Sequence, residues 1–160
     1  MTLHLRPATL DDVAFLADVV ITATMAQNRF PPDVDIDAYR VGYEEWTRET
    51  VLGGIPGCTL SVIEWVGTPI GRFRVVRTPE QLTLAGIQLL PPYQGRGFGT
   101  SLIEDLKAEA ERTRLPLRIS VEKNNPNAQR LYERLGCRQI GEDEDEYHLE
   151  YRPAGRASEG

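Results

Sequence analysis

A glycine-rich run, PYQGRGFGT at residues 92–100, constrains the fold more than any other segment of this chain. It follows an alternating apolar segment, residues 82–90, which predicts a strand, and precedes an amphipathic segment, residues 101–110, which predicts a helix. The first turn of a helix carries unpaired N–H groups and the positive end of the helix dipole. Glycines let the backbone approach a phosphate closely because no Cβ atom intervenes. The run therefore predicts a strand–turn–helix unit that holds a phosphorylated cofactor.

Two common nucleotide-binding motifs do not describe this turn. No strand–helix–strand unit begins the chain and no acidic ribose partner follows at the expected distance, so the turn is not a dinucleotide fingerprint. The Gly-Lys-Ser/Thr ending of a nucleotide P-loop is also missing. Taken by itself, the turn has one alternative interpretation, which is a tight structural connection between a strand and a helix.

The composition is that of one soluble domain. A chain of 160 residues can bury a hydrophobic core, and its net charge of −6 argues against a broad nucleic-acid-binding face. Cys58 and Cys137 imply neither a metal site nor a disulfide framework, and no apolar run reaches the roughly 20 residues of a membrane span. We therefore expect a cytoplasmic protein without nucleic-acid or membrane partners, a single domain over residues 1–152 and a disordered tail over residues 153–160.

Periodicity along the chain predicts an α+β fold. Strands are expected near residues 3–5, 58–65, 70–77, 82–90, 117–121, 137–141 and 147–151. Helices are expected near residues 9–24, 38–51, 101–110 and 127–135. Short turns join the second, third and fourth strands, which predicts an antiparallel meander. A helix separates the fourth strand from the fifth, so that pair should be parallel and the sheet mixed.

A second motif, VEKNNPNAQRLYERLGC at residues 121–137, follows the glycine turn. With both motifs in place, the chain resembles the GCN5-related N-acetyltransferase (GNAT) family. The family's cofactor motif, Gln/Arg-x-x-Gly-x-Gly/Ala, is matched by Gln94, Gly97 and Gly99. Its later motif, Asn-x-x-Ala-x-x-Leu-Tyr-x-x-x-Gly-Phe, is matched from Asn125 to Gly136, with a cysteine in place of the final phenylalanine. The order of elements matches over roughly residues 3–151.

The resemblance implies the three-layer α/β/α GNAT fold. Its mixed central sheet would have about seven strands, antiparallel early and parallel at a central splayed pair, with about four helices. It also implies acetyl-CoA as the co-substrate and no metal. The turn that would hold the cofactor's pyrophosphate comprises Gln94, Gly95, Arg96, Gly97, Phe98, Gly99 and Thr100. Arg96 would add a charged phosphate contact, or else remain a solvated turn residue.

The strand before the turn has its own implied role. The backbone groups of Ile87, Gln88 and Leu89 would pair with the pantetheine arm as an added strand would. An amide near Leu89 would then polarise the thioester carbonyl. In the second motif, Tyr132 would act as general acid and protonate the departing thiolate, or else be a core tyrosine. Asn125 would contact the cofactor, or else only cap the following helix.

The general base is less well indicated. Amine acceptors are mostly protonated at neutral pH, so a base has to remove a proton. One position that some relatives use falls on Ser120, which cannot serve as a carboxylate, whereas Glu122 lies two residues on and shares its strand face. His148 is expected to be structural or exposed. Other carboxylates that could reach a substrate groove, or remain surface groups, are Glu44, Glu45 and Glu64.

Two acidic segments border the acceptor groove in this family. Here they are residues 33–37, with three aspartates, and residues 142–146, and both could attract a cationic amine or simply be solvated loops. Aromatic residues that could line the groove or pack in the core are Tyr39, Tyr43 and Trp46. The predicted activity is acetyl transfer from acetyl-CoA to a small-molecule or peptide amine in a ternary complex. The alternatives are a non-catalytic CoA-binding sensor or partner module and an enzyme that uses another acyl-CoA; the resemblance also allows a homodimer.

Overall fold

The structure is a computed structural model that describes residues 2–154. Its strands are β1 (Leu3–Pro7), β2 (Cys58–Trp65), β3 (Thr68–Arg77), β4 (Leu82–Leu89), β5 (Leu117–Glu122), β6 (Arg138–Glu142) and β7 (Glu146–Tyr151). Its α-helices are α1 (Val13–Ala26), α2 (Ile36–Val51), α3 (Phe98–Thr113) and α4 (Pro126–Arg134), and short 3-10 helices are η1 (Leu10–Asp12) and η2 (Pro91–Tyr93). Most of the tail predicted at residues 153–160 lies outside the described residues.

The chain divides into two compact units. Within residues 2–154, unit 1 comprises residues up to 75 and 86–96, and unit 2 comprises residues 76–85 and those from 97 on. Within the described residues, seven strands follow the order β1-β2-β3-β4-β5-β7-β6. Strands β1 and β2 pair antiparallel, whereas β4 and β5 pair in parallel. The predicted fold class, an α+β fold with a mixed seven-stranded sheet and four helices, is thereby confirmed.

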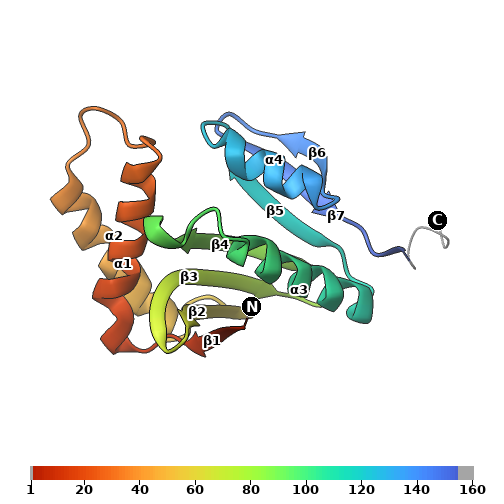
Figure 1. Cartoon of the computed structure of the whole chain (residues 1–160), viewed down its shortest axis with the longest axis horizontal. Helices are drawn as coiled ribbons and strands as arrows, with labels where there is room; N and C mark the ends of the chain where they lie inside the picture. The colour runs from red at the N-terminus through yellow and green to blue at the C-terminus, as the bar shows by residue number, and fades with distance from the viewer. Residues whose placement is uncertain (1, 155–160) are drawn as a thin grey trace. The chain divides into compact units, whose positions relative to one another are not determined.

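Unit 1 packs α1 and α2 side by side next to the first strands (Figure 1). The predicted start of the first helix is confirmed by a capping box, in which the Thr9 N–H donates to Asp12 Oδ2 at 2.8 Å. This box belongs to η1, and α1 continues from it at Val13. Leu16 of α1 is fully buried against Leu60 and Val62 of β2, so the apolar stripe of the helix forms the core of this unit.

A glycine allows β3 and β4 to approach each other closely in unit 1. A Cβ atom added at Gly71 would lie 2.4 Å from the carbonyl oxygen of Gln88 and 3.1 Å from the Cδ1 of Ile63. Backbone atoms cannot yield to such a contact as the end of a flexible side chain can. Position 71 therefore has to be glycine if the segment 87–89, to which the cofactor arm is assigned, is to keep its place.

We expect Gly71→Ala to lower the free energy of unfolding by about 1–3 kcal/mol, the usual cost of overpacking a tightly packed site. The matched control is Gly42→Ala in α2, where an added Cβ meets nothing within 4 Å. That change should raise stability by about 0.5–1 kcal/mol, because alanine favours helix interiors over glycine. Urea unfolding of both variants measures the two effects, and equal stability of the two proteins would contradict the close approach.

Unit 2 contains the parallel pair and the last hairpin. Leu82–Leu84 of β4 pair with Leu117–Ile119 of β5, and β7 pairs antiparallel with both β5 and β6. The buried stripe of α3 consists of Phe98, Leu102, Ile103, Leu106 and Ala110. A buried carboxylate, Glu150, accepts from Arg118 Nε at 2.6 Å and from Arg152 Nε at 2.8 Å. The predicted splay of β4 from β5 stays a prediction.

Two helices begin earlier than the sequence predicts. Helix α2 begins at Ile36 because the Asp35 carboxylate accepts from the Ala38 N–H at 3.1 Å. Helix α3 begins at Phe98, inside the glycine run, because the preceding residue, Gly97, ends the turn in a left-handed conformation. Within residues 2–154, no helix is both long and apolar enough to cross a membrane.

Candidate functional site

The glycine turn opens α3 without a side-chain cap. Gly95 and Gly97 have φ angles of +70° and +86°, in the left-handed region that favours glycine. Gly97 is the N-cap residue of the 16-residue helix, and no side chain caps it. The first-turn amides, including those of Gly99 and Thr100, are therefore presented at the positive end of the helix dipole. This geometry fits a phosphate group, as the sequence predicts.

Gln94 connects the turn to the end of β4. Its Nε2 donates to the carbonyl oxygen of Leu89 at 2.9 Å, so the structure brings together two residues of the predicted cofactor site. The next residue, Leu90, donates its N–H to Ile70 of β3 at 2.9 Å. Neighbouring residues of a strand direct their N–H groups to opposite edges, so the Leu89 N–H should face away from β3. That direction is the one required for an added strand or a thioester carbonyl.

Arg96 lies on aromatic rings. Its guanidinium carbon is 4.8 Å from the ring centroid of Trp65 and 5.7 Å from that of Tyr93, and Nη1 is 3.5 Å from the carbonyl oxygen of Pro92. The sequence left open whether Arg96 binds a phosphate or is a solvated turn residue. The structure shows an exposed side chain that cation–π contacts hold in place. The contact of Arg96 with a cofactor phosphate stays a prediction.

The second motif forms α4 and its cap. Asn125 is the N-cap, and its Oδ1 accepts from the Ala128 N–H at 3.4 Å, while Pro126 occupies the first turn. The capping role of Asn125 is therefore observed, and its contact with the cofactor stays a prediction. Tyr132 is buried on the same helix with 6% of its surface exposed. This burial is compatible with both interpretations of Tyr132, a core tyrosine and a general acid that is shielded from solvent.

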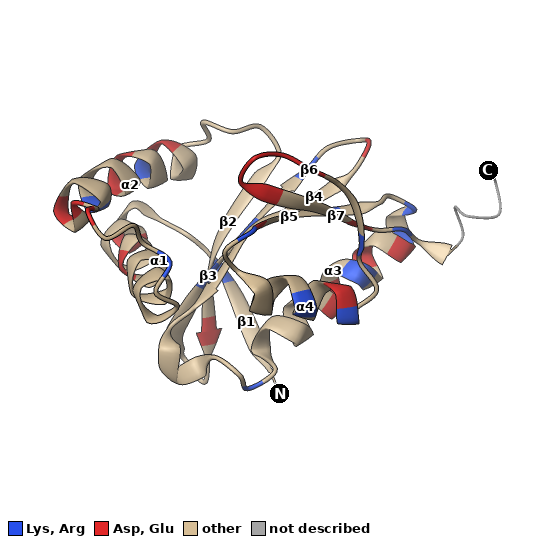
Figure 2. Cartoon of the chain, turned by 90° about the horizontal axis from the view of Figure 1, so that it is seen from above, with Lys and Arg blue, Asp and Glu red and all other residues tan. Residues whose placement is uncertain are grey.

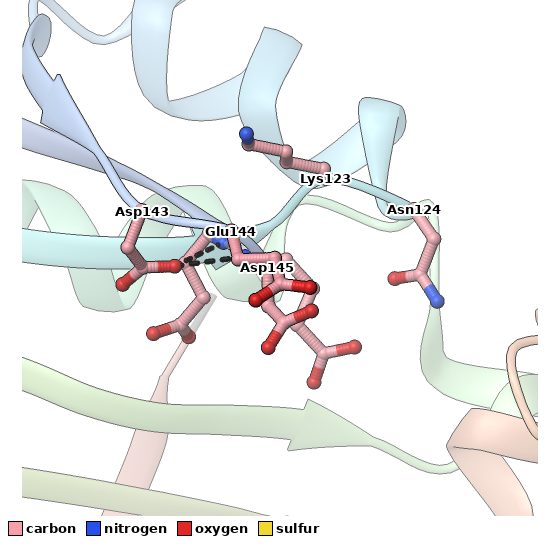
Figure 3. A pocket seen from close by; sticks show the side chains of 7 residues that line it. Lys123, Asn124, Asp143, Glu144 and Asp145 are labelled. Atoms are coloured by element: carbon pink, nitrogen blue, oxygen red, sulfur yellow. Dashed lines mark hydrogen bonds between the residues drawn. The ribbon is translucent and has the colours of Figure 1, made fainter.

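An acidic cavity of about 620 Å³ lies at the end of β5 and in the β6–β7 connection. Its lining residues are Glu122, Lys123, Asn124, Asp143, Glu144, Asp145 and Glu146. Figure 3 shows the carboxylates of Asp143, Glu144 and Asp145 close together, and Figure 2 shows acidic residues concentrated in this hairpin. Backbone N–H groups of Asp145 and Glu146 donate to Asp143 Oδ1, at 2.9 and 2.8 Å, and lower its pKa. The cavity is therefore negatively charged and suits a cation.

The candidate bases lie in different surroundings. Glu122 is exposed and lines the acidic cavity. Glu64 instead accepts from Arg6 Nε at 3.1 Å, and Glu44 lies 3.8 Å from Arg48 within α2. Of these three carboxylates, Glu122 is the one that lines the acidic cavity.

Two arginines of β3 that alternate with Phe73 and Val75 are covered by the aromatic residues of α2. The guanidinium of Arg72 lies over Tyr43 and Trp46, and that of Arg74 lies 4.9 Å from the Trp46 centroid. Arg72 is only 2% exposed, and this burial lowers its pKa. Its Nη1 donates to Gln88 Oε1 at 2.9 Å. The aromatic residues of α2 thus pack on cations. The sequence did not indicate this arrangement, because arginines that alternate with apolar residues along a strand are typical of an exposed polar face.

The arginine pair depends on a second glycine. A Cβ atom added at Gly86 would lie 2.4 Å from Arg72 Nη1, so the guanidinium occupies the space that a side chain would fill. The Nε atoms of Arg72 and Arg74 are both buried without a hydrogen-bond partner. Through Gln88, this cluster supports the strand segment assigned to the pantetheine arm. Among residues 2–154, no three His, Cys, Asp or Glu side chains are arranged to hold a metal ion.

Comparison with known proteins identifies the family and similar folds. The model of the acetyltransferase (GNAT) family matches residues 22–137, and no curated protein matches the chain. The PaiA N-acetyltransferase from Thermoplasma acidophilum, solved with coenzyme A, has a TM-score of 0.77 at 18% identity, covering 95% of this chain and 99% of its own. The N-acetyltransferase PseH from Campylobacter jejuni, solved with acetyl coenzyme A, has a TM-score of 0.61 at 16% identity, covering 94% and 99%. A spermidine N-acetyltransferase chimera from Vibrio cholerae and hSSAT has a TM-score of 0.67 at 19% identity, covering 95% and 96%.

Proposed function

Because this chain belongs to the GNAT acetyltransferase family, we propose that it transfers an acetyl group from acetyl-CoA to a primary amine by direct attack in a ternary complex. The uncapped start of α3 after two left-handed glycines carries this proposal. Such a turn binds an anion through backbone amides, and the pyrophosphate of CoA is such an anion. When bound, acetyl-CoA supplies an activated thioester.

The residues that would hold the cofactor follow from the two segments described. The amides of residues 95–100 would bind the pyrophosphate, and the backbone of Ile87 and Leu89 would pair with the pantetheine arm. Gln94 would keep these two segments in register, because it joins the turn to the Leu89 carbonyl. The Leu89 N–H would then polarise the thioester carbonyl as oxygen gains negative charge.

Proton transfers would complete the reaction. Tyr132 would protonate the departing thiolate, which is an undemanding transfer because a thiol has a pKa near 8.5. Glu122 is the carboxylate candidate for the base. The acceptor would be a small cationic amine, since the cavity beside Glu122 is lined by carboxylates. The likeness to a spermidine N-acetyltransferase chimera supports an amine acceptor of this kind.

Calorimetric titration with acetyl-CoA is the first test, with dephospho-CoA and NAD as controls. Micromolar binding of acetyl-CoA that NAD does not reproduce would support the cofactor site. An amine panel with thiol detection then measures transfer. Binding without transfer to any amine would favour a CoA-binding sensor, and tighter binding or faster transfer with a longer acyl chain would favour another acyl-CoA. The absence of any CoA binding would contradict the proposal.

A further inference from the structure

Ser120, His148 and Asp143 form a hydrogen-bonded chain in unit 2. Ser120 Oγ lies 2.9 Å from His148 Nδ1, and His148 Nε2 lies 3.0 Å from Asp143 Oδ2. The register of β5 and β7 places Ser120 directly opposite His148. Asp143 follows β6, in the connection that leads to β7. Strand pairing therefore holds a hydroxyl, an imidazole and a carboxylate in one row.

The hydrogen-bonding capacity of each group determines where the protons lie. A carboxylate only accepts, so the Nε2 of neutral His148 carries its hydrogen and donates it to Asp143. Nδ1 is then unprotonated and accepts the hydroxyl hydrogen of Ser120. Asp143 is held as an anion, because two backbone N–H groups donate to its other oxygen and lower its pKa. A base oriented by a third group is a recurring arrangement in enzymes that activate a nucleophile.

This row of three side chains lies beside the acidic cavity. Asp143 lines the cavity, and so does Glu122, which is two residues from Ser120 and therefore on the same face of β5. Ser120 is itself exposed. An ammonium group attracted into the cavity would meet the face of β5 that carries the Ser120 hydroxyl.

We propose that His148 is the general base of the acetyl transfer and that Ser120 relays the proton to it, an inference that rests on the proposed function. A proton passes from the substrate ammonium to Ser120 Oγ while the Ser120 hydroxyl proton passes to His148 Nδ1. Ser120 is left neutral, His148 becomes an imidazolium paired with Asp143, and the amine becomes a neutral nucleophile. Its nitrogen then attacks the thioester carbon, the C–S bond breaks, and Tyr132 protonates the departing thiolate. A second proton leaves the nitrogen and replaces the proton that Tyr132 gave to sulfur. His148 finally releases its proton to solvent.

Most of the charged groups near His148 are acidic. The charged residues on β5, β6, β7 and the β6–β7 connection are Arg118, Glu122, Arg138, Glu142, Asp143, Glu144, Asp145, Glu146 and Glu150. Arg118 is paired with Glu150, and Lys123 with Glu142, so the remaining acidic groups outnumber the basic ones.

The test compares His148→Gln and Ser120→Ala with wild type on two acceptors. Butylamine is protonated near neutral pH, whereas trifluoroethylamine is largely neutral there and needs no base. We expect both variants to lose about 100-fold in kcat/KM with butylamine, in the usual range for general-base catalysis, and little with trifluoroethylamine. The butylamine deficit should shrink as pH rises and free amine accumulates. The matched control is His4→Gln, because His4 is the other histidine of the chain and is exposed on β1.

Each outcome decides between alternatives. A loss of equal size with both acceptors would show that His148 acts structurally, and an unchanged His148→Gln variant would show that it is not the base. A selective butylamine loss in Glu122→Gln, with His148→Gln unaffected, would assign the base to Glu122 instead. If wild type binds acetyl-CoA yet acetylates neither amine nor any of the panel, the proposed function fails and the relay with it.

Discussion

Gly97→Val should weaken acetyl-CoA binding by about 100-fold or more, equivalent to about 2.7 kcal/mol. A β-branched residue at a φ of +86° is a genuine outlier, so the turn would relax toward a different conformation. The first-turn amides of α3 would then no longer converge on one point, and the added side chain would occupy the approach to them. Calorimetry with acetyl-CoA measures the effect.

Gly53→Val is the matched control for this change. Gly53 has a φ of +90°, and a Cβ atom added there would meet nothing within 4 Å. Both variants should lose stability through the same backbone strain, of order 1–3 kcal/mol. Only Gly97→Val should lose acetyl-CoA. Equal affinity in both variants would show that the glycine run is a structural connection and that the cofactor binds elsewhere.

Tyr132→Phe should lower kcat about 100-fold while the dissociation constant for acetyl-CoA stays unchanged. Loss of a general acid typically costs 10²- to about 10⁴-fold, and the lower end is expected because a thiolate is a good leaving group. Phenylalanine keeps the buried ring of Tyr132, which is 6% exposed, and so preserves the packing of α4. Release of free CoA thiol, followed with a saturating amine, measures kcat.

Tyr147→Phe on β7 is the control for the loss of a phenol. Its ring is half-buried and lies 5.3 Å from Lys123 Nζ, a contact that phenylalanine can also make. This variant should transfer acetyl at the wild-type rate. If Tyr132→Phe also keeps that rate, Tyr132 is a core residue and the thiolate takes its proton from another donor.

Most of the fold could be predicted from local patterns. The alternation of β4 and the apolar stripe of α3 are visible in single segments, since side-chain periods of two and of about 3.6 residues are local properties. The start of the first helix at Thr9 and Asp12 was predicted for the same reason. The starts of α2 and α3 were placed too late, because a cap and a left-handed glycine extend a helix beyond its apolar stripe.

The candidate site was only partly predictable. The glycine turn and the Asn125 cap depend on neighbouring residues, and both are found where the sequence places them. The burial of Arg72 was not indicated, because an arginine that alternates with apolar residues normally marks a solvent face. Its burial depends on Gly86 across the strand pair and on the aromatic rings of α2. Neither the contact with Gly86 nor the contact with the aromatic rings can be predicted from a local sequence pattern.

The sequence by itself determined the order of the elements, the α+β class and the position of the glycine turn to which we assign cofactor binding. These features rest on periodicity, on backbone conformations open to glycine and on two motifs, all of which act over a few residues. Only the tertiary structure decided which distant side chains meet. Ser120 and His148 are 28 residues apart and face each other because of the register of β5 and β7. A shift of one residue would turn every side chain of a strand to its other face, so this contact is a property of the sheet.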